Sequence, residues 1–308
     1  MFNFEELSWS DVRDIFRNYR ENNERKSDEV VQLWEAILED KISKVGVEKF
    51  PIYEQVAIAA LDVGNIGMAE KCIDRLTKEF PGSKRVKLLK SMRLEALEMY
   101  DDALELLDWI IENDVTNAGP RKRKIAILRA RGKRTKAIQE LTEYLKVYMS
   151  DEEAWHLLCS MYLAEGEYGK AVFCMEEVLL HNPHSHLIHQ RIAEIRYTMG
   201  GLENLEIAKT YYSQTVKLNP KNLRGLFGLY LTCNQLANSK IAANKKKETQ
   251  KTAQWALYEA TELTKQHSKI PEVEKYVTSL ENAFGNIDLN KSNKQSTFSA
   301  TSRGGDRE

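Results

Sequence analysis

Apolar residues recur at intervals of three and four positions over most of the chain, which is typical of amphipathic α-helices. Within this pattern Ala69, Ala103, Ala137 and Ala171 lie 34 positions apart, and each is followed three or four positions later by a bulky apolar residue. A fixed interval of this length indicates an internal repeat. The sequence therefore predicts a series of similar helical units.

An interval of 34 residues is that of the tetratricopeptide repeat, a pair of antiparallel helices joined by a short turn. With the repeated alanine at position 20, the stretch from Ala154 to Pro183 places Trp155 at position 4, Cys159 at 8, Tyr162 at 11 and Ala171 at 20. Positions 8 and 20 face each other where the two helices approach most closely, so both require small side chains. Because each pair has an apolar flank that only its neighbour can cover, we predict an all-α fold, a tetratricopeptide-repeat superhelical solenoid.

The same numbering places units at 50–83, 84–117 and 118–151, before the unit that ends near Pro183. The next alanine, Ala208, lies 37 positions after Ala171, so three residues are inserted between them. We expect them in the turn at 200–204, where extra residues cost least. The residues expected to pack at structural positions of the repeat are Ala69, Ala103, Ala137, Trp155, Tyr162, Ala171, Pro183, Ala208 and Pro220.

The two ends of the chain depart from the repeat and predict caps. Residues 1–49 are expected to form capping helices, the first N-capped by Ser8 or Ser10 and the second by Ser27. The array then spans 50–266, with a long polar loop over 238–252 inside its last unit. A capping helix opened by Pro271 is expected over 267–289, followed by a disordered tail over 290–308.

Charge and composition exclude several functional classes. The chain has 45 basic and 46 acidic residues, so no overall field attracts it to nucleic acid or to an anionic membrane. Its longest uncharged stretch, from Gly225 to Ser239, is shorter than a membrane-spanning helix. Glu5, Glu6 and Asp11 stand where a signal peptide would be basic and then apolar. We therefore expect a cytosolic protein.

Candidate catalytic and metal-ligating residues also have a structural interpretation. The four cysteines occupy packing positions of the repeats, with no nearby base that would activate them. His181, His184, His186 and His189 cluster in a turn between units, but no acid or cysteine stands at a matched spacing for a metal site. Phosphate-binding loops and nucleophile motifs are absent from the sequence. We expect neither enzymatic activity nor a cofactor nor a metal.

Two basic patches are candidates for partner binding. Arg121–Lys124 opens the first helix of the third repeat, where Lys122 and Arg129 are expected to point into the concave groove and to meet an acidic partner segment. A solvated helix end is the alternative. The lysines between Lys240 and Lys251 could face anionic headgroups, or could form a solubilising loop.

The groove positions also exclude one known binding mode. Co-chaperones that clamp an acidic C-terminus use lysine and asparagine at positions 5 and 9 of one repeat. These positions hold Glu54 and Ile58 in one unit, and His156 and Ser160 in another. A carboxylate clamp is therefore not expected, although His156 and Ser160 should face the groove.

Several segments carry a resemblance to a known family: YEQVAIAALD (53–62), FPGSKRVK (80–87), RKRKIAI (121–127), GGLENLE (200–206) and FGLY (227–230). Over about residues 5–285 the chain resembles the family of the second subunit of the endoplasmic reticulum membrane protein complex. The resemblance implies a peripheral scaffold on the cytoplasmic face of the endoplasmic reticulum membrane. Such a scaffold belongs to a hetero-oligomer that inserts transmembrane domains of tail-anchored and multipass proteins, with the insertion step performed by other subunits.

In that family the groove holds cytosolic segments of membrane-embedded subunits, and a small cytosolic subunit also docks. From their positions in this sequence, the residues expected to bind partners are Lys122, Arg123, Lys124, Arg129, His156 and Ser160. Membrane association would be indirect, through these partners, and no nucleic acid is expected. The alternative is a free cytosolic adaptor or co-chaperone that binds client peptides.

Overall fold

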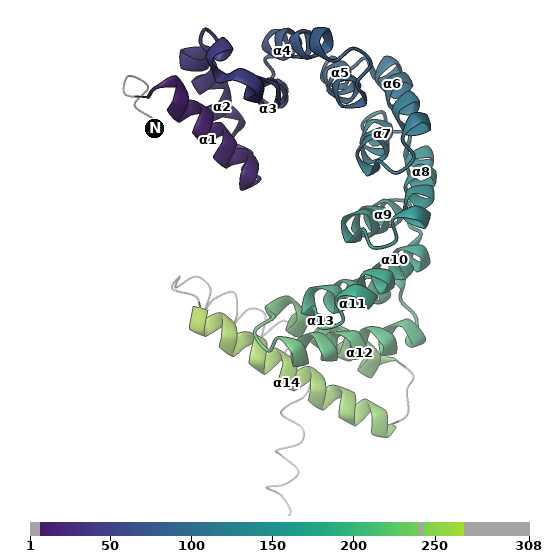
Figure 1. Cartoon of the computed structure of the whole chain (residues 1–308). Helices are drawn as coiled ribbons and strands as arrows, with labels where there is room; N and C mark the ends of the chain where they lie inside the picture. Colours follow the sequence, from purple (N-terminus) through teal and green to yellow (C-terminus); the bar gives the residue numbers. More distant parts are fainter. Residues whose placement is uncertain (1–6, 240–242, 268–308) are drawn as a thin grey trace, which may run out of the picture. The chain divides into compact units, whose positions relative to one another are not determined.

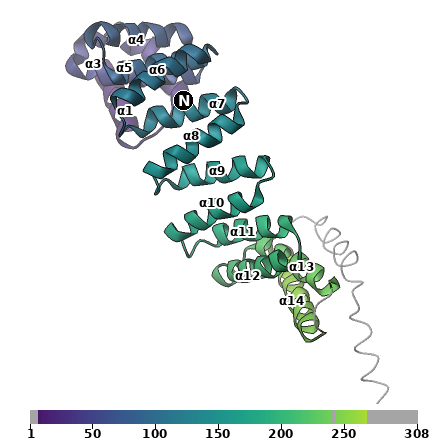
Figure 2. The same cartoon turned by 90° about the vertical axis from the view of Figure 1, so that its right-hand side faces the viewer.

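The computed structural model describes residues 7–239 and 243–267. Its regular elements are helices, and no strand occurs within these two ranges (Figure 1). The chain divides into two units, Met1–Tyr148 and Met149–Glu308. Most helices form pairs whose members lie side by side in both views (Figures 1 and 2). The prediction of an all-α fold made of repeated helix pairs is confirmed.

The first unit begins with elements that precede the repeats. These are α1 (Trp9–Glu21), α2 (Ser27–Leu33), a π-helical segment η1 (Trp34–Leu38) and a 3₁₀ segment η2 (Ile42–Glu48). Three helix pairs follow: α3 (Lys49–Asp62) with α4 (Ile66–Glu79), α5 (Lys84–Ala96) with α6 (Tyr100–Asn113), and α7 (Ala118–Ala130) with α8 (Arg134–Val147).

The repeated alanines lie in the core. Ala69, Ala103 and Ala137 are completely buried, as the close approach of the two helices of a pair requires. Before the first pair, Phe16 and Leu33 are completely buried in the same apolar cluster as the α3 side chains. The elements before residue 49 therefore cover the apolar flank of the first pair.

The turns within the pairs share one backbone conformation. Gly64, Gly132 and Gly166 stand at position 15 of their repeats, with φ of 79°, 71° and 74°. Glycine adopts this left-handed conformation without steric cost, which explains its recurrence. In the 84–117 repeat the equivalent residue is Glu98, with φ of 60°.

The second unit contains three further pairs. They are α9 (Glu152–Ala164) with α10 (Tyr168–His181), α11 (His186–Met199) with α12 (Leu202–Leu218), and α13 (Leu223–Asn238) with α14 (Ala243–His267).

The residues of the second unit that were predicted to pack at structural positions of the repeat differ in burial. Ala171 and Ala208 are completely buried. The Trp155 indole donates a hydrogen bond to the Met149 carbonyl at 2.8 Å, and Tyr162 is half-buried. Pro183 and Pro220 lie exposed, just beyond the last residues of α10 and α12.

The extra residues of the fifth repeat lie in a helix, so the expectation of a longer turn is wrong. Only Gly200 and Gly201 separate α11 from α12. Helix α12 has 17 residues, whereas α4, α6, α8 and α10 have 14 each. Each residue added to a helix gains a backbone hydrogen bond, which favours lengthening the helix over lengthening the turn.

The expected long loop over 238–252 is also wrong, because α14 begins at Ala243. Lysine, glutamate and glutamine are good helix formers, and Thr249 and Ala253 give this polar stretch a buried face. Of its lysines, Lys245 pairs with Glu206 at 3.4 Å.

One of the two predicted N-caps is confirmed. The Ser8 hydroxyl accepts from the Asp11 amide at 3.3 Å, and the Asp11 carboxylate accepts from the Ser8 amide at 2.9 Å. Ser27, in contrast, is the first residue of α2, and its hydroxyl donates to Asp62 at 2.6 Å. This hydrogen bond to a charged acceptor is stronger than a cap bond to an amide, which explains why the second prediction is wrong.

Two expectations fall outside the described residues: most of the capping helix over 267–289 and the whole tail over 290–308. Among the helices that are described, none is long and apolar enough to cross a membrane.

Candidate partner-binding groove

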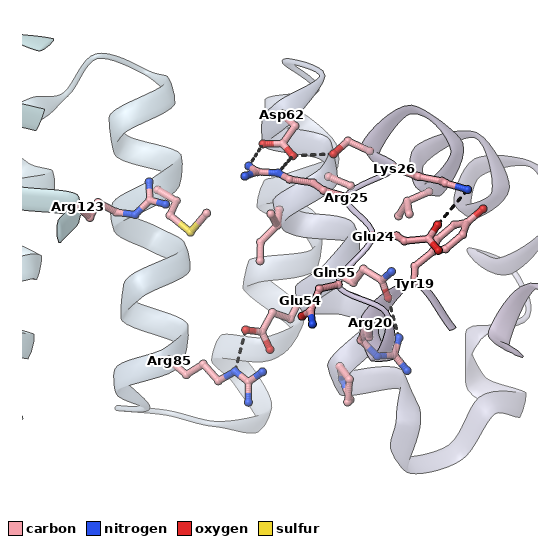
Figure 3. Close-up of a pocket in the computed structure, with 17 residues that line it drawn as sticks. Tyr19, Arg20, Glu24, Arg25, Lys26, Glu54, Gln55, Asp62, Arg85 and Arg123 are labelled. Atoms are coloured by element: carbon pink, nitrogen blue, oxygen red, sulfur yellow. Dashed lines mark hydrogen bonds and ion pairs between the residues drawn. The ribbon is translucent and has the colours of Figure 1, made fainter. Parts of the chain in front are cut away.

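A groove of about 560 Å³ lies on one face of the first unit, formed by α1, the segment that follows it, and the first helices of the repeats (Figure 3). Its apolar lining includes Val30, Ile58, Ala59 and Met92. The charged side chains that line it are Arg20, Glu24, Arg25, Lys26, Glu54, Asp62, Arg85 and Arg123.

The repeat explains why side chains from distant segments meet here. Glu54 and Ile58 occupy positions 5 and 9 of the first repeat, and Arg85 and Met92 occupy positions 2 and 9 of the second. These positions lie on the side of each first helix that its own partner helix does not cover. Stacking successive first helices therefore forms one continuous face.

The charges in the groove are paired between elements. Arg25 binds the Asp62 carboxylate, with its Nε donating at 2.8 Å, and this contact lowers the pKa of Asp62. Arg85 Nε lies 2.7 Å from a carboxylate oxygen of Glu54 (Figure 3). The side chains of Arg25 and Arg85 are 71% and 75% exposed. The carboxylates that they bind are only 26% and 21% exposed, so the outward-facing part of each pair is the guanidinium group.

Arg123 lines the groove from α7. Its Nη1 donates to Glu95 of α5 at 2.6 Å. Lys124, the next residue, points to the other side of α7, with its ammonium 2.9 Å from both Asp108 and Glu140. The structure therefore places Arg123 at the groove and Lys124 away from it, against the second helices α6 and α8.

Lys122 and Arg129 are exposed on α7, together with Ala126 between them. The three residues follow the spacing of one helix face. The Lys122 ammonium lies 5.9 Å from the centre of the Tyr144 ring. Neither basic residue lines the 560 Å³ groove itself.

His156 and Ser160 are exposed on α9 of the second unit. The Ser160 hydroxyl donates to the Leu157 carbonyl one turn earlier, at 2.7 Å. Both residues thus belong to a different unit from the α7 residues that were grouped with them.

Sequence reasoning missed Arg20, Arg25 and Arg85 as groove residues. The first two belong to the segment assigned to a cap, and local periodicity does not reveal which face of the array a cap covers. For Arg85 a signal existed, because it stands at position 2 of its repeat, on the same face as Glu54.

The residues weighed for chemistry have ordinary packing environments. All four cysteines are buried, and burial raises the pKa of Cys159 and Cys233 to about 11 and that of Cys72 and Cys174 to about 12. The imidazole of His186 lies within hydrogen-bonding distance of the side-chain amides of Asn219 and Asn222. Within the described ranges no group of histidine, cysteine and acidic side chains could hold a metal ion.

Comparison with known proteins decides the family. The model of the EMC2 TPR-like repeat domain matches residues 79–214. The ER membrane protein complex subunit 2-A of Xenopus laevis is 48% identical over 252 residues, which cover 82% of this chain and 85% of the relative. The chain belongs to the ER membrane protein complex subunit 2 family.

More distant relatives extend this family assignment. ER membrane protein complex subunit 2 of Dictyostelium discoideum is 31% identical over 276 residues, covering 85% of each chain. The TPR repeat protein oca3 of Schizosaccharomyces pombe is 32% identical over 198 residues, covering 64% of this chain and 70% of that protein. The predicted resemblance to the subunit 2 family is confirmed.

The fold also matches solved tetratricopeptide structures. The C-terminal part of a TPR repeat-containing protein from Cytophaga hutchinsonii aligns with a TM-score of 0.58 and 15% sequence identity, covering 85% of this chain and 97% of that one. At this identity the likeness shows the fold alone. The chain is thus a subunit 2 family member with tetratricopeptide repeats.

Proposed function

We propose that this chain is a non-enzymatic scaffold subunit on the cytoplasmic face of the endoplasmic reticulum membrane. In this role it holds cytosolic segments of membrane-embedded subunits, together with a small cytosolic subunit. It thereby organises a complex that inserts the transmembrane domains of tail-anchored and multipass proteins. Family membership supports the assignment to the complex, and stacked helix pairs are the kind of fold that offers extended binding surfaces.

The observation that carries the proposal is the charge of the groove in the first unit. Five basic side chains and three acidic ones line it, and Arg20 and Arg123 pair with two further acids outside the lining, Glu48 and Glu95. The guanidinium groups of Arg25 and Arg85 are 71% and 75% exposed, and a guanidinium group can bind a further carboxylate beside its first. An acidic segment of a partner can therefore bind these guanidinium groups beside Asp62 and Glu54, while its apolar side chains cover Ile58 and Met92.

Lys122 and Arg129 extend the same proposal along α7. Their exposed face offers two further cations to a segment that leaves the groove past Arg123. Lys124 is not included, because its two acidic partners already hold it against α6 and α8.

Co-purification from cells tests the proposal. We expect the double variant Arg25→Gln/Arg85→Gln to lose stoichiometric recovery of the membrane-embedded subunits, with an unchanged circular dichroism spectrum. Lys122→Glu/Arg129→Glu should weaken the same recovery. The matched control is Lys71→Gln/Lys146→Gln, which neutralises two exposed cations on the second helices α4 and α8.

Full recovery of the membrane-embedded subunits with both groove variants would show that the groove does not bind them. Weak binding of many unrelated peptides, without stoichiometric subunits, would instead indicate a free cytosolic adaptor.

A further inference from the structure

A second cavity, of about 500 Å³, lies within the second unit and differs in chemistry from the groove of the first. It is open on the face formed by the first helices α11 and α13. Its apolar and aromatic lining consists of Leu163, Tyr168, Ile195, Tyr197, Tyr212, Phe227 and Leu231. A volume of this size, lined by apolar and aromatic side chains and only a few polar groups, is typical of ligand-binding sites in proteins.

Two glycines of α13 set the shape of this cavity. A Cβ atom at Gly228 would overlap the ring of Tyr212, and one at Gly225 would meet the Thr215 methyl group at 2.7 Å. The absence of both side chains allows α13 to lie directly on α12. As a result the Tyr212 ring lies against the α13 backbone at Gly228, and both residues line the cavity.

The charged side chains that line this cavity are two arginines, Arg191 and Arg224, and one acid, Glu194. The carboxylate of Glu194, which is 18% exposed, serves both arginines of the cavity. It lies 2.6 Å from Arg224 Nε and 3.3 Å from Arg191 Nη1. It also accepts a hydrogen bond from the Gln190 side-chain amide at 2.8 Å. One buried acid therefore balances two cations, and the cavity carries one positive charge in excess.

Arg224 is the cation best placed to meet a ligand. Its side chain is 73% exposed, and it contacts Glu194 through Nε. The terminal nitrogens of the guanidinium group remain available, since the part of the chain that the structure describes offers Arg224 no second acid. A planar guanidinium can bind a second carboxylate through these nitrogens.

We propose that this cavity is a peptide-binding site for a partner segment in which a bulky apolar side chain stands beside an acidic one. The apolar side chain enters between Tyr197, Phe227 and Leu231, and the carboxylate binds the terminal nitrogens of Arg224. A purely apolar ligand would leave the excess charge unmatched. A purely acidic one would leave the aromatic lining exposed to water. The site goes beyond the scaffold role proposed above, since it is a second site, in the second unit, with a mainly apolar and aromatic lining.

Fluorescence anisotropy with the full chain tests the proposal. The probe is a labelled peptide, acetylated and amidated, in which one phenylalanine stands between two aspartates on a glycine–serine background. We expect saturable binding that falls about tenfold or more when the phenylalanine is replaced by glycine, or when both aspartates are replaced by asparagine. Higher salt should weaken the binding further.

Variants of the chain locate the site. Arg224→Gln and Leu231→Ser change exposed side chains at the rim, and each should reduce affinity about tenfold with an unchanged circular dichroism spectrum. Lys146→Gln, which neutralises an exposed cation of α8 that lines neither the first groove nor this cavity, is the matched control and should leave affinity unchanged. Since co-purification tests the first groove and this titration tests the second cavity, the two proposals can fail separately.

Three results would overturn the assignment. They are no saturable binding of the probe, equal binding of the peptide that lacks phenylalanine, and unchanged affinity of both Arg224→Gln and Leu231→Ser. Self-association of the chain through this face, detected by analytical ultracentrifugation and abolished by Leu231→Ser, would also contradict a peptide ligand.

Discussion

At the scale of single residues, the small side chain at position 20 of each repeat sets the distance between paired helices. Ala171 is completely buried between α9 and α10, and it has no space for additional atoms. A longer side chain there must force the helices apart or bury a charge. Both effects are costly.

We expect Ala171→Arg to lower the free energy of unfolding by about 3 kcal/mol or more. Denaturant titration followed by circular dichroism measures the change. Ala164→Arg is the matched control, because Ala164 is exposed at the end of α9 and its replacement should change stability by less than about 0.5 kcal/mol. Similar losses at the two sites would show that the α9–α10 contact is not close-packed.

Cysteine reactivity gives a second residue-scale prediction. The pKa of each thiol is raised by burial, to about 11 or about 12, so at pH 8 the reactive thiolate is scarce in the folded chain. Ordinary cysteine, with a pKa of about 8.5, is partly ionised at that pH. All four thiols should react with Ellman's reagent at least about a hundredfold more slowly in the folded chain than in denaturant. One thiol that reacts as fast before unfolding as after it would point to an accessible site.

The sequence alone did not reveal which basic side chains form ion pairs within the fold. Arg123 and Lys124 are neighbours in the sequence, yet one lines the groove and the other binds acids of α6 and α8. The partner of Arg123 is Glu95, 28 positions away. Such pairing depends on the offset between neighbouring repeats, which periodicity does not specify.

At the scale of the helical elements, position 15 lies in the turn inside each of the first five pairs, and its backbone φ is positive. Four repeats place glycine there (Gly64, Gly132, Gly166 and Gly200), and the repeat at 84–117 places Glu98, with φ of 60°. A residue with a side chain is strained in this conformation by about 1 kcal/mol.

We therefore expect Glu98→Gly to leave stability unchanged or to raise it by up to about 1 kcal/mol. Gly132→Glu should lower stability by about 1 kcal/mol, although a Cβ at Gly132 would meet no atom within 4 Å. Thermal unfolding of Glu98→Gly and Gly132→Glu measures both changes in stability. A clear loss of stability in Glu98→Gly would mean that the glutamate side chain makes a contact worth more than the strain.

The helix pairs themselves were predictable, because alanine spacing and apolar periodicity depend on short-range geometry that recurs in every unit. The exceptions share a cause. The residues after Gly201 and the polar stretch after Ala243 were expected in a turn and a loop, and both are helical. Each lies where a helix is extended against a neighbour, and contacts to that neighbour are not visible in the local pattern.

At the scale of the whole molecule, the near-zero net charge does not show how charged side chains are distributed over the two units. The groove of the first unit carries five basic and three acidic side chains, and the cavity of the second carries two and one. The first is lined mainly by ion pairs, and the second by aromatic rings. The sequence alone indicated that a repeat array would bind partner segments, but not that the chain offers two surfaces of different chemistry.

The central claim is that the chain is a stoichiometric scaffold subunit of a membrane complex, although none of its described helices can span a membrane. The most direct test is affinity purification from fractionated cells, with intact-mass measurement of the chains that co-purify. The account predicts recovery from the membrane fraction at fixed stoichiometry with membrane-embedded subunits, lost in Arg25→Gln/Arg85→Gln. A chain found only in the soluble fraction, bound substoichiometrically to a varied set of proteins, would contradict it.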